Sequence, residues 1–416
     1  MGVPDWIWFV FVFAFGCCVG SFLNVVIYRL PRDRSLVKPG SACPSCGRGI
    51  RFYDNIPLVS WVVLGAKCRY CKASISPRYF VIELLTGLVF TGLCILYFRT
   101  DFRPSVGSFG QGGWFVYLLH IILLGSLIAA SAIDVELWVI PMSICWFATA
   151  AGLIGCGAGV CVIGPAKISQ TLLLPSTSDI FFKEVTVASL AVGALIGLVI
   201  SWLLLVTGLI KRSYESSESS DSPGQPDESA EPHLKAVRSE PPSPTDVPAP
   251  PASNGAVSSN GVNHRLEMCK EIIFLLPIII CSLAAYWIGR KSSAMQSLDF
   301  SQHPVIAGVL GSLWGYFVGC GVVWATRIFG TLGFGKEAMG LGDVHLMGAA
   351  GAVVGPVFVV VAFFIAPFLG LAWAGFQMFF KKTRQIPYGP FLSLGILAVM
   401  ILHDWILSYW NLIRYH

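Results

Sequence analysis

The feature that most constrains this chain is a series of apolar runs, each long enough to cross a lipid bilayer. A helix needs about 20 apolar residues to span roughly 30 Å of hydrocarbon. Of the 416 residues, 55% are hydrophobic and only 12% are charged. Because a soluble core cannot absorb so many apolar side chains, we expect an all-α polytopic membrane protein with about eight to ten transmembrane helices. The runs lie near residues 6–28, 79–98, 114–133, 139–163, 186–210, 272–289, 303–328 and 390–410.

A further apolar stretch, 346–380, is longer than one crossing requires and is interrupted at Gly355-Pro356. Charge favours two helices here. The segment 29–78 holds 10 of the 28 Lys and Arg residues and only two acids, so the positive-inside rule places it in the cytoplasm. The basic run 381–384 lies on the same side only if the chain crosses the membrane twice within this stretch. We therefore predict ten spans, with both chain termini outside.

The first span and the segment 213–263 need separate interpretations. The first span has no basic region before it and carries Asp5, so we interpret it as an uncleaved helix rather than a signal peptide. Residues 213–263 are rich in Ser, Pro, Glu and Asp and contain no Phe, Trp, Ile or Cys. They cannot bury enough apolar surface to fold, and we expect a disordered cytoplasmic linker. The net charge of +5 suits anionic membrane lipids and does not indicate a nucleic acid partner.

Four of the 13 cysteines form two Cys-x-x-Cys pairs, Cys43 with Cys46 and Cys68 with Cys71, separated by 21 residues. Two such pairs can supply four thiolates to a tetrahedral Zn²⁺ ion, at a separation just beyond the usual range. Four thiolates close the coordination shell, so the metal would be structural. Disulfides are the alternative, and a reducing cytoplasm argues against them. We expect the core of this small zinc-knuckle domain to consist of Ile56, Leu58, Val59, Trp61, Val62 and Leu64.

Two aspartates, Asp134 and Asp343, lie at the edges of apolar spans. An ionisable group is costly to place at the rim of a bilayer, which favours a functional role. Two neighbouring carboxyl groups that share one proton provide a base and an acid, and can activate water for amide hydrolysis without a metal. The predicted topology places both on the cytoplasmic side. Two alternatives remain open: Asp343 caps a helix that begins near Val344, and Asp134 is a solvated residue in a turn before Ile140.

Several short runs, taken together, resemble the prepilin peptidases. These are inner-membrane aspartic proteases that process type IV prepilins and type II secretion pseudopilins. The resemblance covers roughly residues 1–150 and 303–410. The runs are Gly20-Ser21-Phe22-Leu23-Asn24-Val25, Asn55-Ile56-Pro57-Leu58-Val59-Ser60-Trp61, Ile133-Asp134 with Ile140-Pro141, Gly340-Leu341-Gly342-Asp343, and Ile386-Pro387-Tyr388-Gly389-Pro390-Phe391.

The resemblance implies catalytic roles for Asp134 and Asp343. It also implies cleavage of a prepilin leader after a Gly, at the cytoplasmic face of the bacterial inner membrane. Many members then methylate the new N-terminus with S-adenosylmethionine, and the cysteine domain is associated with that activity. No glycine-rich nucleotide loop is visible, so the residues that would bind this cofactor remain unknown.

The chain departs from the family pattern at two positions near the acids. Met142 stands where the family usually has Asp, and His345 where it usually has Lys. Two extra helices and the linker look like an insertion. The expected organisation is a first helix (1–30), a cytoplasmic four-cysteine domain (31–78), helices carrying the first acid (79–163), the insertion (164–302) and helices carrying the second acid (303–416).

Two other function classes compete with a protease. A non-catalytic assembly subunit would keep the fold and dock partners through its zinc domain, and retention of both acids argues against it. A transporter would carry its proton-relay acids at mid-span, whereas these two lie at span edges.

Overall fold

A computed structural model describes residues 4–178, 183–210, 264–296, 302–380 and 387–415. Within these ranges the regular structure is helical apart from two isolated β-bridges, which confirms the predicted all-α class. Nine of the described helices are long and apolar enough to cross a membrane. They are α1 (Asp5–Arg29), α3 (Pro77–Phe98), α4 (Gly113–Leu137), α5 (Met142–Ile163), α7 (Glu184–Val206), α8 (His264–Lys291), α10 (Pro304–Phe334), α12 (Pro356–Phe380) and α13 (Gly389–Tyr415).

The stretch 346–380 does form two helices, but the first is shorter than a full span. Helix α11 (Leu341–Val354) has 14 residues and rises only about 21 Å. It ends because Gly355 has a φ of +92° and Pro356 starts the next helix. The space beyond its end is occupied by residues 172–178, where Leu173 and Leu174 are buried. The linker predicted at 213–263 and the basic run 381–384 lie outside the described residues.

Glycines allow the helices to approach closely. A Cβ atom on Gly16 of α1 would lie 2.8 Å from the Cα of Gly87 on α3, and one on Gly20 would lie 2.8 Å from the Cα of Glu83. On α10, a Cβ on Gly315 would collide with the carbonyl of Gly351 on α11. In lipid there is no hydrophobic drive between helices, so small residues that let backbones meet supply much of the packing.

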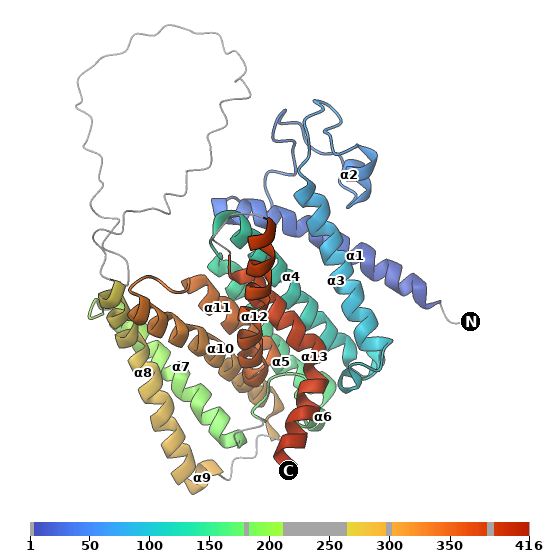
Figure 1. Cartoon of the computed structure of the whole chain (residues 1–416). Coiled ribbons are helices and arrows are strands. Elements are labelled where there is room, and N and C mark those ends of the chain that lie inside the picture. The colour runs from blue at the N-terminus through green and yellow to red at the C-terminus, as the bar shows by residue number, and fades with distance from the viewer. Residues whose placement is uncertain (1–3, 179–182, 211–263, 297–301, 381–386, 416) are drawn as a thin grey trace, which may run out of the picture.

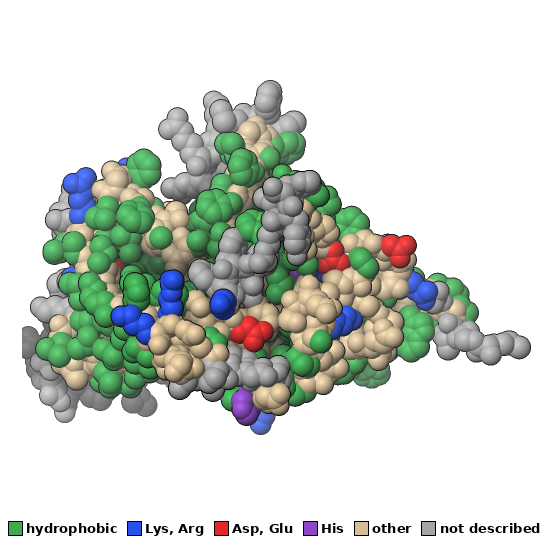
Figure 2. Space-filling model, turned by 90° about the horizontal axis from the view of Figure 1, so that it is seen from below, with side chains coloured by type: hydrophobic (Ala, Val, Ile, Leu, Met, Phe, Trp, Pro, Cys, Tyr) green, Lys and Arg blue, Asp and Glu red, His purple; other side chains and the backbone are tan. Residues whose placement is uncertain are grey.

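Helices α7 and α8 lie side by side at one edge of the bundle and pack against α10 (Figure 1). Helix α8 begins at His264, eight residues before the predicted start at 272. Its first two turns carry charged residues that find polar partners: Glu267 bonds Lys270, and Glu271 bonds Arg327 of α10. Seen from below, the molecule shows hydrophobic side chains interspersed with other side chains and a few charged ones (Figure 2). The spans expose large hydrophobic side chains such as Trp202, Ile279 and Phe368, as expected of helices in contact with lipid.

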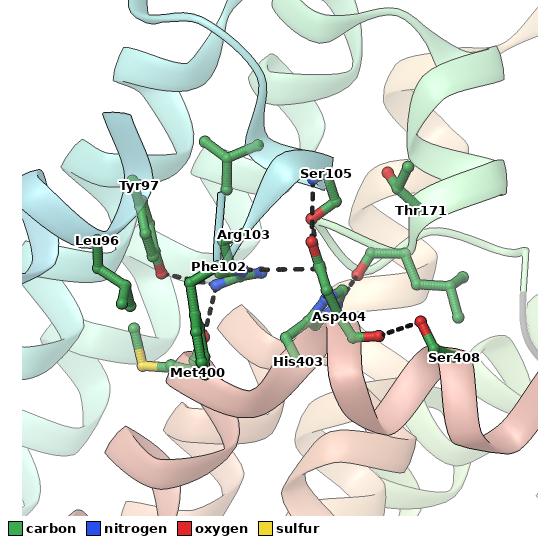
Figure 3. Close-up of polar contacts among 12 residues, drawn as sticks. Leu96, Tyr97, Phe102, Arg103, Ser105, Thr171, Met400, His403, Asp404 and Ser408 are labelled. Atoms are coloured by element: carbon green, nitrogen blue, oxygen red, sulfur yellow. Dashed lines mark hydrogen bonds and ion pairs between the residues drawn. The ribbon is translucent and has the colours of Figure 1, made fainter. Parts of the chain in front are cut away.

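A buried polar cluster fixes the C-terminal half of α13 (Figure 3). Arg103, from the loop between α3 and α4, is 1% exposed and donates to the Tyr97 hydroxyl and to the Met400 carbonyl, each at 2.7 Å. Asp404 of α13 accepts from the Ser105 backbone N–H at 3.0 Å. These bonds anchor the middle of α13, which begins at Gly389.

Candidate functional site

The two predicted acids come from helices far apart in sequence and lie close enough for their charges to interact. Asp134 lies in the last turn of α4, and Asp343 is the third residue of α11. Each is only 8% exposed. Asp134 is therefore not a solvated turn residue. Helix α11 begins before Asp343, with Gly340 at the N-cap, and the Gly340 backbone N–H faces the Asp343 carboxyl group.

The start of α13 closes the site over Asp134. The backbone N–H of Gly389 donates to Asp134 Oδ2 at 3.0 Å. A Cβ atom at position 389 would lie 2.7 Å from that oxygen and 3.2 Å from Ile140 Cδ1, so only glycine fits without displacing the carboxylate. Three segments, α4, α11 and the start of α13, thus meet at one point.

Two further residues line this meeting point. The chain at Ile140 packs on the glycines before Asp343, since a Cβ on Gly342 would lie 2.7 Å from Ile140 Cβ. Tyr388, half-buried just before α13, lies near Asp343. Burial, with the charge of Asp343, raises the pKa of the Tyr388 phenol to about 12. Its hydroxyl therefore stays neutral near pH 7 and can act as a hydrogen-bond donor.

The two departures from the family pattern occupy different places. Met142 is the first residue of α5. His345 lies on α11 with its ring 5.6 Å from that of Trp146, and its Nδ1 is 3.0 Å from the Tyr316 hydroxyl. The imidazole thus packs against α5 and α10, away from the helix face that carries Asp343.

A buried arginine lies near Asp343, and the sequence alone does not identify it as part of the site. Arg327 of α10 is 2% exposed, and its charge reaches Asp343. Its guanidinium is 2.9 Å from Glu271 of α8 and 2.6 Å from Glu337, and it also donates to the Met339 carbonyl. The available signal was an arginine near the end of one apolar run and a glutamate directly before another.

This arginine holds the loop that leads into the second acid. Glu337 and Met339 both belong to residues 335–340, directly before α11. The Ala338 backbone N–H adds a bond to the Thr331 hydroxyl at 3.1 Å. The loop before Asp343 is therefore tied to α10, and through Glu271 to α8.

The four paired cysteines lie in two turns with the same hydrogen-bond pattern. The Cys43 N–H donates to Arg48 O at 2.9 Å, and the Cys68 N–H donates to Ala73 O at 2.8 Å. Each turn is closed by one β-bridge, Ala42 to Gly49 in the first and Lys67 to Ser74 in the second. The repeated geometry is that of two matched metal-binding knuckles.

The knuckles bring all four sulfur atoms within 4.8 Å of one another, and Cys43 Sγ lies 3.7 Å from Cys71 Sγ. Four thiolates about 2.3 Å from a tetrahedral Zn²⁺ would lie about 3.8 Å apart, so the set fits this ion. Backbone N–H groups of Cys71 and Tyr70 point at the Cys68 sulfur and lower the pKa of its thiol to about 6. That favours the thiolate a metal requires.

The predicted core of the cysteine domain is largely wrong. Within 56–64, Val59 is 54% exposed and Val62 is 62% exposed, on the short helix α2 (Val59–Val63). Trp61 instead packs against Phe80 of α3, with ring centroids 5.0 Å apart and the rings tilted by 37°. A domain this small can dispense with an apolar core of its own when it has a metal site and a helix to pack on.

The domain is attached close to the acids. The Leu58 backbone N–H donates to Glu83 of α3 at 2.8 Å. Arg78, at the start of α3, pairs with Glu136 of α4 at 2.6 Å, and Glu136 is two residues beyond Asp134. The knuckles therefore stand next to the end of α4 that carries the first acid.

Comparison with known proteins places two parts of the chain in described families. Residues 14–97 match the Bacterial Peptidase A24 N-terminal domain, and residues 273–375 match the Type IV leader peptidase family. The first match includes the cysteine domain, and the second includes Asp343. Asp134 lies between the two matched segments. The second match begins within α8, inside the range predicted as an insertion.

Curated relatives match over shorter lengths. A prepilin leader peptidase/N-methyltransferase of Myxococcus xanthus is 46% identical over 135 residues, which are 32% of this chain and 36% of the relative. A type 4 prepilin-like proteins leader peptide-processing enzyme of Escherichia coli is 40% identical over 139 residues, 29% of this chain and 46% of the relative. A prepilin leader peptidase/N-methyltransferase of Pseudomonas aeruginosa is 44% identical over 97 residues, 18% and 33% of the two chains.

In these alignments the chain spans between a third and a half of each relative's length. No solved structure matches the chain.

Proposed function

The chain is a member of the type IV leader peptidase family, and we propose that it is an aspartic endopeptidase that removes the leader of type IV prepilins or type II secretion pseudopilins. Cleavage follows a Gly, at the cytoplasmic face of the bacterial inner membrane. The observation that carries this proposal is that two buried acids from separate helices, Asp134 and Asp343, lie around Ile140. Gly389 contacts both Asp134 and Ile140, and Gly342, the residue before Asp343, packs on Ile140.

The pair supplies a base and an acid in one place. One carboxylate removes a proton from a water molecule, whose oxygen attacks the carbonyl carbon of the scissile peptide bond. The protonated partner hydrogen-bonds the carbonyl oxygen as negative charge develops there. A proton then passes to the leaving amine, and the C–N bond breaks. The shared proton belongs to the pair as a whole, so we assign neither role to one residue.

The surrounding chain positions the acids. The Gly389 N–H fixes one oxygen of Asp134 at 3.0 Å, and the Arg327 contacts hold the loop before Asp343. Such positioning matters because a misplacement of about 1 Å can cost a factor of about 100 in rate.

The four-cysteine cluster is proposed as a structural zinc site, with Cys43, Cys46, Cys68 and Cys71 as ligands. The ion would stabilise the knuckles, since zinc-binding free energy becomes folding free energy in small domains. It would take no part in peptide cleavage, because four thiolates leave no coordination position for water.

Methylation of the new N-terminus by S-adenosylmethionine is proposed as a second activity. Two observations support it: the M. xanthus and P. aeruginosa relatives are prepilin leader peptidase/N-methyltransferases, and residues 14–97 match the Bacterial Peptidase A24 N-terminal domain. The mass of the mature pilin N-terminus, with and without the methyl donor, tests it. A gain of about 14 Da, one methyl group in place of a hydrogen on the amine, supports methyl transfer, and an unchanged mass contradicts it.

The peptidase proposal is tested with the purified full-length protein in detergent and a prepilin whose leader ends in Gly. Mass spectrometry of the products should place the cut directly after that Gly. An intact substrate under conditions where the protein stays monodisperse would favour the alternative of a non-catalytic assembly subunit.

A further inference from the structure

Helix α2 presents an apolar face that nothing in the described chain covers. Val59, Val62 and Val63 are 54%, 62% and 74% exposed. Their spacing of three and four residues places them on one side of the helix. The opposite side carries Trp61, which packs against Phe80 of α3. The helix therefore turns its apolar residues away from the protein.

The depth of α2 can be read from its partners on α3. Arg78 lies at the start of α3, where the apolar run begins, and Glu83 follows it by five residues, a rise of about 7 Å. The backbone of Leu58, the residue before α2, bonds to Glu83. Trp61 contacts Phe80, between these two levels. The start of α2 therefore lies beside residues that belong to the apolar part of a membrane span.

The charge of the surrounding segment complements a membrane surface. Residues 29–78 hold ten of the 28 Lys and Arg residues and only two acids. Basic residues close to a bilayer are attracted to anionic headgroups. Short helices with an apolar face and basic neighbours lie in the interface, with the apolar face buried about 5–10 Å into the boundary between headgroups and acyl chains.

We propose that the Val59, Val62 and Val63 face of α2 inserts into the bilayer that α3 crosses, at the level of its anionic headgroups and first acyl carbons. Lipid then covers the three valine side chains that the cysteine domain leaves exposed. This contact keeps the two cysteine turns close to the membrane surface, beside the ion pair of Arg78 and Glu136 at the end of α4. The proposed insertion follows from burial and depth, and it does not depend on catalysis.

The test measures the depth of single side chains in the full-length protein. p-Acetylphenylalanine is placed at Val62 or Val63 and labelled with a hydroxylamine nitroxide, a reaction that leaves the 13 cysteines untouched. The protein is reconstituted in nanodiscs of phosphatidylcholine with phosphatidylglycerol. Power saturation then compares collisions of the label with oxygen, which concentrates in lipid, and with a water-soluble nickel chelate.

Two control positions calibrate the scale. Val81 of α3 is 53% exposed within a span and should report lipid. Ser45, exposed between the cysteines of the first knuckle, should report water. Labels at Val62 and Val63 are expected to give an oxygen-to-nickel collision ratio at least about threefold above that at Ser45 and close to that at Val81. Ratios equal to that at Ser45 would overturn the proposal and leave the face free for a protein partner.

Discussion

Gly389 donates its backbone N–H to the Asp134 carboxylate at 3.0 Å, although the two residues are 255 positions apart in sequence. The bond joins the first residue of α13 to the last turn of α4, beside the start of α11. A hydrogen bond to a charged group contributes about 1.5–3 kcal/mol, and this one also fixes the direction of the carboxylate. The candidate site thus depends on three helix ends that only the folded chain brings together.

Replacing Gly389 with Ala should disrupt this contact. The added Cβ would lie 2.7 Å from Asp134 Oδ2, so the carboxylate or the start of α13 must move. Loss of a bond to a charged group corresponds to a decrease of about 10- to 100-fold in kcat for leader cleavage. The measurement is the initial rate of cleavage by purified protein at saturating substrate.

The matched control is Gly375→Ala on α12, where a Cβ would meet nothing within 4 Å. It should retain the parent rate. Equal rates for both variants would show that the Gly389 contact does not position the acid.

The zinc assignment makes a quantitative prediction. The purified protein should contain about one zinc ion per chain, because four thiolates complete one tetrahedral shell. Replacing Cys43 and Cys46 together with Ser should remove nearly all of it, since two remaining thiolates bind zinc weakly. Elemental analysis by mass spectrometry measures the metal. Cys161→Ser, at an exposed position on α5, should leave the content unchanged, and zinc retained by the double variant would disprove the ligand set.

The ion pair between Glu271 and Arg327 should support both stability and activity. Glu271→Ala leaves a buried guanidinium without its partner on α8, and breaking such a pair costs about 3–5 kcal/mol. We expect a lower unfolding temperature in detergent and slower leader cleavage, because Arg327 also holds the loop before Asp343.

Glu184→Ala serves as the comparison, since Glu184 is exposed at the start of α7 and bonds only to Ser178 among its described side-chain contacts. It should resemble the parent protein. If Glu271→Ala proved as stable and active as Glu184→Ala, the ion pair would have no part in holding the site.

Much of the fold could be predicted because apolar runs of sufficient length leave a membrane helix as the main solution. The exact helix boundaries are harder to predict from the sequence. The described part of α8 includes residues 264–271, ahead of the predicted apolar run, and there Glu271 pairs with Arg327, a partner that hydropathy does not reveal. Helix α11 ends at the predicted interruption, Gly355-Pro356, and the contact of Pro175 with Gly355 is a tertiary feature that the sequence does not show.

The residues of the candidate site show the same difference. Those marked by local sequence patterns could be predicted, and those defined by contacts between distant residues could not. The four paired cysteines could be singled out by their spacing, and Asp134 and Asp343 by the flanking runs that resemble the prepilin peptidases. The structure brings the four sulfur atoms together and places both acids around Ile140. Arg327 could not be predicted as a site residue, because it lies inside an apolar run. Its contacts with Glu271, Glu337 and Met339 form only in the folded chain. The apolar sequence predicts Val59 and Val62 of α2 as core residues, whereas apolar residues beside a bilayer need not face the protein.

The most direct test of the central claim measures leader cleavage of a co-expressed prepilin by Asp134→Asn and Asp343→Asn variants. Cleavage is detected as a decrease in the mass of the pilin. Each variant keeps the shape of the side chain and removes its acid. Both should leave the prepilin uncleaved while the protein still reaches the membrane, and Asp101→Asn, at an exposed loop position, should cleave normally. Normal cleavage by either acid variant would contradict the account.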